Sequence, residues 1–137
     1  MAAGTQRTLA LADLAATRRL GRALARALGP GDVVGLQGPL GVGKTELARA
    51  VLAALGVADE VPSPTFTLVQ VYDLEPTPVW HADLYRLERP DDAVELGLED
   101  AFAAAITLIE WPERLGDGLP PDRLDVVLAI AALPGAR

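Results

Sequence analysis

Cysteine is absent from this chain of 137 residues, and aromatic side chains are few. Without cysteine, neither a disulfide framework nor a thiolate metal site is possible. No apolar run is long enough to span a membrane, and Met1–Arg7 lacks the apolar stretch of a secretion signal. We therefore expect a cytoplasmic protein with no membrane partner, whose core is built mainly from Leu, Val and Ala.

Basic residues are also scarce. The formal net charge is −7, and Lys44 is the only lysine beside eleven arginines. Binding along a nucleic-acid backbone usually needs basic patches, so this charge argues against a broad nucleic-acid surface. It does not exclude a protein that acts on a partner which itself processes nucleic acid.

The single lysine lies in Gly38-Pro39-Leu40-Gly41-Val42-Gly43-Lys44-Thr45, which fits the phosphate-binding P-loop pattern G-x-x-x-x-G-K-[ST]. A buried strand is expected over Asp32–Gln37 before this loop, and a helix over Glu46–Leu55 after it. Backbone N–H groups of such a loop point into one concavity, where the helix dipole also favours an anion.

Within this P-loop, Lys44 is expected to reach the β- and γ-phosphates of a nucleotide, and the Thr45 hydroxyl to bind Mg²⁺. A compact ammonium suits the phosphates better here than the planar fork of arginine. The residues expected to hold the nucleotide are Pro39, Leu40, Gly41, Val42, Gly43, Lys44, Thr45 and Glu46.

The segment before the P-loop is expected to form a short edge strand over residues 5–10 and then a helix over Leu14–Leu28, with Asp13 as its N-cap. Apolar residues fall on one face of this helix, and the opposite face carries Arg18, Arg22 and Arg26. This arginine stripe is either a solvated face or a docking surface.

Prolines hold the segment Val61–Thr67 extended. The next two strands, Leu68–Asp73 and Val79–Tyr85, are predicted to form an antiparallel hairpin. Two short helices and then two strands follow: Pro90–Leu96, Leu98–Ala103, Ala105–Pro112 and Asp122–Ile130. This alternation predicts a three-layer α/β/α P-loop NTPase with a mixed, mainly parallel sheet and one antiparallel hairpin, in a single domain over residues 1–137.

Hydrolysis would require a metal-holding acid and a group that positions water. Glu110 closes an apolar strand in the manner of a Walker B acid, and Asp83 lies near the end of a hairpin strand. Either acid can hold Mg²⁺, directly or through water, while the other orients the attacking water. Thr65, between prolines and the hairpin, is placed like a switch threonine that senses the γ-phosphate.

Plainer interpretations of these residues stay open. Glu110 can cap a local N–H group, and Asp83 can be a surface acid of the hairpin. His81, the only histidine, is interpreted as a strand residue rather than as a catalytic base. Trp111 is either a core residue or a residue that stacks on substrate or partner, and Tyr85 can be structural.

Several classes of P-loop protein fit poorly. A Ras-like GTPase reads guanine with an Asn/Thr-Lys-x-Asp element, and this chain has no asparagine and no second lysine. A small-molecule kinase usually carries a lid with several arginines, and here Arg86 and Arg89 are the only nearby pair. The alternatives to an ATPase are nevertheless a small-molecule kinase on this fold and a nucleotide-gated binding module with negligible turnover.

Sequence blocks along most of the chain resemble the TsaE (YjeE) family, small bacterial ATPases needed for the threonylcarbamoyladenosine modification of tRNA. The blocks are Leu36–Thr45, Ser63–Val69, His81–Leu87, Glu95–Leu98 and Ile109–Glu113. The P-loop is shared with many families, but Ser-Pro-Thr-Phe-Thr, Asp-Leu-Tyr-Arg and Ile-Glu-Trp-Pro at this spacing are specific. The resemblance implies ATP hydrolysis with Mg²⁺, coupled to the partner proteins TsaD and TsaB and to tRNA only through their complex.

The resemblance also implies roles for individual residues. Thr65, Asp83 and Glu110 would be catalytic, and Thr45 would join the two acids at the metal. Trp111 would lie near the nucleotide. Two positions depart from the family pattern: Glu46 stands where many relatives carry a second threonine, and Pro39 where an acid is common.

Overall fold

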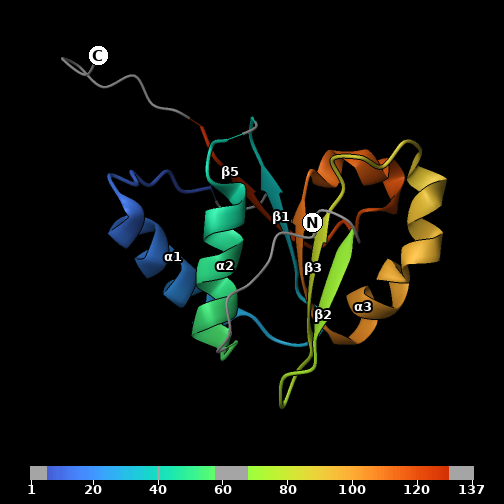
Figure 1. Cartoon of the computed structure of the whole chain (residues 1–137), viewed down its shortest axis with the longest axis horizontal. Helices are drawn as coiled ribbons and strands as arrows, with labels where there is room; N and C mark the ends of the chain where they lie inside the picture. The colour runs from blue at the N-terminus through green and yellow to red at the C-terminus, as the bar shows by residue number, and fades with distance from the viewer. Residues whose placement is uncertain (1–5, 40, 58–67, 130–137) are drawn as a thin grey trace.

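The computed structural model describes residues 6–39, 41–57 and 68–129 (Figure 1). The elements in chain order are α1 (Leu14–Ala27), β1 (Val33–Gln37), α2 (Lys44–Leu55), β2 (Val69–Tyr72), β3 (Val79–Asp83), the 3₁₀ helix η1 (Pro90–Leu96), α3 (Leu98–Ala104), β4 (Ile106–Glu110), the 3₁₀ helix η2 (Pro112–Gly118) and β5 (Leu124–Val127). None of the helices in these ranges is both long and apolar enough to cross a bilayer.

The expected edge strand over residues 5–10 is wrong for its described part, because residues 6–12 form no strand. Side chains of this segment, including Leu9 and Leu11, instead border a groove against α1 and β5. The helix that follows begins as predicted: Asp13 caps it by accepting a hydrogen bond from the Ala16 N–H at 2.9 Å. The helix start predicted from the local capping signal at Asp13 is therefore correct. The predicted strand, which pairs with no other strand among the described residues, is not.

Five strands form one sheet in the order β2-β3-β4-β1-β5, in which only β2 and β3 pair antiparallel. The register places Asp83 of β3 beside Glu110 of β4, and Glu110 beside Leu36 of β1. Parallel strands end at the same edge of a sheet. The two acids and the loop that leaves β1 therefore meet at one edge.

Helices cover both faces of this sheet: α1 and α2 lie on one side, and α3 with η1 and η2 on the other (Figure 1). Side chains alternate between the two faces along each strand, as expected for β-structure. Val34 and Leu36 belong to the apolar cluster under α2, whereas Val33 belongs to the cluster under η1 and α3. The predicted three-layer architecture is therefore confirmed.

The packing of α1 against α2 depends on Gly21. A Cβ atom added there would lie 2.5 Å from Ala50 Cβ, whereas one added at Gly29 would meet no atom within 4 Å. We expect Gly21→Val to lower the free energy of unfolding by about 1–3 kcal/mol through overpacking, and Gly29→Val to change it by less than about 0.5 kcal/mol. Urea unfolding of both variants checks this, and equal stabilities would contradict it.

Candidate functional site

The loop between β1 and α2 adopts backbone conformations that depend on its glycines. Gly38 has a φ of 145°, and a Cβ atom there would lie 2.5 Å from the Leu128 carbonyl oxygen. Gly43, the N-cap of α2, has a φ of 113°, and a Cβ atom there would meet nothing within 4 Å. The chain thus turns tightly at Gly38 and opens onto free space at the start of the helix.

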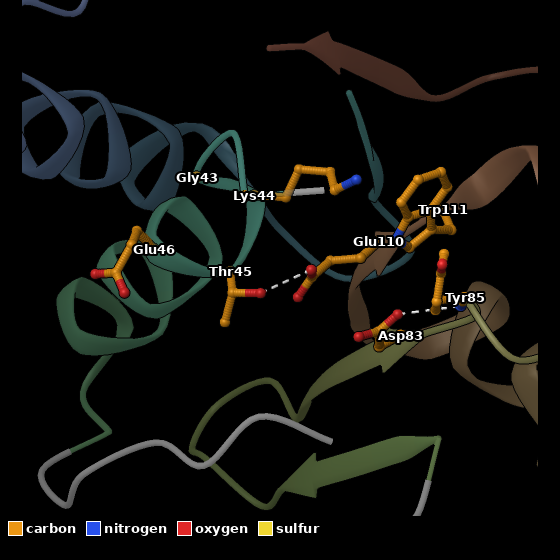
Figure 2. Close-up of a pocket in the computed structure, with 9 residues that line it drawn as sticks. Gly43, Lys44, Thr45, Glu46, Asp83, Tyr85, Glu110 and Trp111 are labelled. Atoms are coloured by element: carbon orange, nitrogen blue, oxygen red, sulfur yellow. Dashed lines mark hydrogen bonds between the residues drawn. The ribbon is translucent and has the colours of Figure 1, made fainter. Parts of the chain in front are cut away.

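A cavity of about 350 Å³ lies beside this helix start and the carboxyl ends of β3 and β4 (Figure 2). Its lining residues come from three separate parts of the chain: Gly41, Gly43, Lys44, Thr45, Glu46, Asp83, Tyr85, Glu110 and Trp111. Pro39 and Val42 belong to the loop but do not line the cavity, while Leu40 and Thr65 lie outside the described residues. The fold therefore brings together most of the residues that the sequence singled out.

Lys44 is held over this cavity with only 4% of its surface exposed. Its Nζ donates to the Gly38 carbonyl oxygen and lies 3.5 Å from the centroid of the Trp111 ring, within the range of a cation–π interaction. Burial lowers the pKa of Lys44, while the nearby carboxylates of Glu110, Glu113 and Asp83 oppose that shift. The lysine is thus the cation of an otherwise acidic cavity.

Glu110 is 2% exposed, and each of its carboxylate oxygens has a partner. The Thr45 hydroxyl donates to Oε1 at 2.8 Å (Figure 2), and His81 Nε2 lies 2.8 Å from Oε2. With Glu110 ionised, His81 donates its Nε2–H, since a carboxylate is only an acceptor. The Thr45–Glu110–His81 chain therefore fixes the orientation of the carboxylate.

The contact of His81 with Glu110 was missed by sequence reasoning, which interpreted the histidine as a plain strand residue. His81 is fully buried on β3. The signal that could have found it is the spacing of two residues between His81 and Asp83, which puts both side chains on one face of a strand. Its contact with Glu110 also depends on how β3 and β4 pair.

Asp83 on β3 is the register partner of Glu110 on the neighbouring strand β4, and it is half-buried. Its Oδ1 accepts a hydrogen bond from the Tyr85 N–H at 3.1 Å (Figure 2). Burial raises the pKa of Asp83; the Tyr85 N–H opposes this shift, and the charge of Glu110 adds to it. Two carboxyl groups with different surroundings thus face one cavity.

Trp111 follows β4 in a left-handed conformation, with φ 59° and ψ 50°. This region is unusual for an aromatic residue and costs about 1–3 kcal/mol, so it occurs where surroundings enforce it. The ring lies under Lys44, and 5.0 Å from the ring of Tyr85, a residue that sequence reasoning left as structural. The two rings form the aromatic wall of the cavity (Figure 2).

The donor groups of this cavity fit a nucleotide phosphate with Mg²⁺. The Thr45 hydroxyl and the Glu110 carboxylate bring hard oxygen atoms within 2.8 Å of each other, and Mg²⁺ prefers oxygen ligands. The Thr45 hydroxyl donates its hydrogen bond to Glu110, which leaves the lone pairs of the hydroxyl oxygen available to a cation. The open space at Gly43 and the ammonium of Lys44 suit an anion beside that cation.

The family model described as "Threonylcarbamoyl adenosine biosynthesis protein TsaE" matches residues 11–133. The chain belongs to the TsaE family. The match spans the P-loop, both acids and Trp111, so the family resemblance of the sequence blocks is confirmed.

Individual TsaE proteins match over most of their length. The "tRNA threonylcarbamoyladenosine biosynthesis protein TsaE" of Rickettsia bellii (strain RML369-C) is 40% identical over 115 residues, which are 83% of this chain and 80% of the relative. The protein of the same name from Bacillus subtilis (strain 168) is 37% identical over 113 residues, 82% of this chain and 70% of the relative.

A solved structure also matches this TsaE chain. It is the crystal structure of YdiB from Bacillus subtilis, with a TM-score of 0.72 and 30% sequence identity over 85% of this chain and 72% of that chain. The agreement supports the architecture predicted from the sequence, a three-layer P-loop NTPase fold with a mainly parallel sheet.

Proposed function

We propose that this TsaE-family protein binds ATP with Mg²⁺ and hydrolyses it as an accessory subunit of the complex that makes N6-threonylcarbamoyladenosine in tRNA. The observation that carries the proposal is the cavity that joins Lys44 and Thr45 of the P-loop to two acids, Asp83 and Glu110. The shared name of its relatives supports the pathway. The proposal includes TsaD and TsaB as protein partners, a single ATPase domain over residues 1–137 and a cytoplasmic location.

In this proposal the P-loop, from Pro39 to Glu46, holds the phosphates through its backbone N–H groups, and Lys44 holds them through its ammonium. Thr45 and Glu110 hold Mg²⁺, which neutralises charge on the β- and γ-phosphates when bound. The 2.8 Å hydrogen bond between these two residues supports this assignment, because it holds both metal-binding oxygen atoms close together before the ion binds.

Asp83 orients the attacking water in the proposal. It lies beside Glu110 on the neighbouring strand, and burial raises its pKa, so it is a better proton acceptor than an exposed aspartate. Thr65 acts as the switch residue that senses the γ-phosphate. Trp111 borders the nucleotide and shields Lys44 from water, in keeping with its place in the cavity wall.

The experiment that tests the function is phosphate release from ATP by the purified protein with TsaB and TsaD. Hydrolysis is expected to need Mg²⁺, Lys44 and both partners. Phosphate transfer to an added small molecule without partners would indicate a kinase instead. Tight ATP binding with no hydrolysis under any partner condition would indicate a nucleotide-gated binding module.

Trp111 fluorescence should change when nucleotide is added. The Lys44 Nζ lies 3.5 Å from the Trp111 ring, and phosphates would draw this ammonium away from it. Titrating ATP into a Trp80→Phe variant, which leaves Trp111 as the single tryptophan, measures the change. A constant signal across a titration that shows binding by calorimetry would remove Trp111 from the nucleotide site.

His81 is predicted to position Glu110. His81→Phe should lower kcat about 10- to 100-fold, the usual cost of losing the partner that orients a metal ligand, with little change in KM. His81→Gln should retain activity within a few-fold of wild type, since its amide N–H can replace the Nε2–H. Steady-state kinetics of both variants check this, and wild-type activity of His81→Phe would mean that the histidine only fills space.

A further inference from the structure

A second groove lies on the outer surface of α1 and α2, which run side by side on one face of the sheet (Figure 1). It encloses about 460 Å³. Its charged residues are Arg18 and Arg22 of α1 with Glu46 and Arg49 of α2. We call it the arginine groove. It is separate from the cavity between the P-loop and the acids, although Glu46 borders both.

Positive charge is concentrated at this groove in a chain whose net charge is −7. Helix α1 carries four arginines and no acidic residue between Leu14 and Ala27. Within the described residues, neither Arg18 nor Arg22 forms an ion pair, and the acidic side chain of the groove, Glu46, pairs with Arg49 at 3.1 Å. The groove therefore presents guanidinium groups to whatever binds there.

The other residues that line the groove are apolar, and most of them are alanines. Leu14 is 47% exposed, and Ala53 and Ala54 are exposed on α2. Small side chains on α2 leave room for another chain to approach closely, and Leu14 gives it an apolar contact. A ligand that matches this groove must combine carboxylates with apolar side chains.

We propose that the arginine groove docks an acidic segment with apolar side chains from a protein subunit of the modification complex. The identity of that partner rests on the proposed function. A protein segment fits better than RNA, since none of the lining residues is an aromatic that could stack on a base, and the net negative charge repels a polyanion.

Docking in this groove would reach the nucleotide cavity through Glu46. The Glu46 side chain points away from Glu110 and Trp111 (Figure 2), and it pairs with Arg49. A carboxylate of the partner would compete with Glu46 for the Arg49 guanidinium. Glu46 lies on the first turn of α2, which also carries Lys44 and Thr45. If the partner changes nucleotide affinity by some factor, nucleotide changes partner affinity by the same factor.

The test is binding of the full chain to a purified TsaB–TsaD complex, measured by calorimetry with and without ATP. Arg18→Glu/Arg22→Glu should weaken binding about tenfold or more at low salt, and less at high salt. The matched control is Arg19→Glu/Arg26→Glu, on the same helix with the same charge change but outside the groove. It should bind within about twofold of wild type.

Each other outcome overturns the proposal. Equal binding by the two double variants would mean that the groove is not the docking surface, while the proposed function would stand. Failure of the wild-type chain to bind TsaB–TsaD would contradict both the docking proposal and the proposed function. Binding of tRNA alone that Arg18→Glu/Arg22→Glu abolishes, with unchanged binding to TsaB–TsaD, would make the groove an RNA site. Circular dichroism melting and the neutral pair Arg18→Gln/Arg22→Gln, which should show a smaller loss, separate charge from misfolding.

Discussion

Lys44→Met should lower kcat/KM for ATP hydrolysis about 100- to 1,000-fold, the range seen when one charge stabiliser is removed from an active site. Lys44 is the only lysine of the chain, and its ammonium lies at the start of α2 over the cavity. Methionine has an unbranched apolar side chain like the stem of lysine, but it lacks the ammonium. The loss would therefore report the charge rather than the packing.

The matched comparison for Lys44 is Lys44→Arg, which keeps the positive charge. Lys44 is almost fully buried between Gly38 and the Trp111 ring, and the larger planar guanidinium does not fit that space. We expect Lys44→Arg to lose most of the activity as well. Calorimetry with ATP and phosphate-release assays check both variants, and wild-type hydrolysis by Lys44→Met would refute the proposed function.

Local patterns in the sequence predicted most of the fold. The Asp13 cap, the strand before the P-loop and the hairpin were each predictable from a few neighbouring residues. The predicted strands put the P-loop, Asp83 and Glu110 at or near strand carboxyl ends, and ligands of α/β sheets bind at that edge. The register of β3, β4 and β1 does bring them to that edge.

The features that the sequence did not predict depend on contacts between distant residues. The contact of His81 with Glu110 needs the pairing of β3 with β4. The left-handed turn at Trp111 is imposed by the surroundings and contradicts the preference of an aromatic residue. The periodicity of α1 revealed its arginine stripe, but not the groove that Arg18 and Arg22 share with Arg49, which forms because α1 and α2 approach closely at Gly21 and Ala50.

Glu110→Gln should retain ATP binding and lower kcat about 100-fold or more, because glutamine keeps the shape of the side chain but removes its charge. The Mg²⁺ concentration for half-maximal rate should rise, since the proposal makes Glu110 a holder of the metal with Thr45.

The control for Glu110 is Asp83→Asn, on the neighbouring strand. If Asp83 orients water, this variant should lose kcat without any rise in the required Mg²⁺ concentration. Rates measured across a Mg²⁺ series for both variants distinguish the two acids. The opposite pattern would exchange their roles, and loss of ATP binding together with turnover in Glu110→Gln would mean that the carboxylate, with its partners Thr45 and His81, maintains the fold of the site instead.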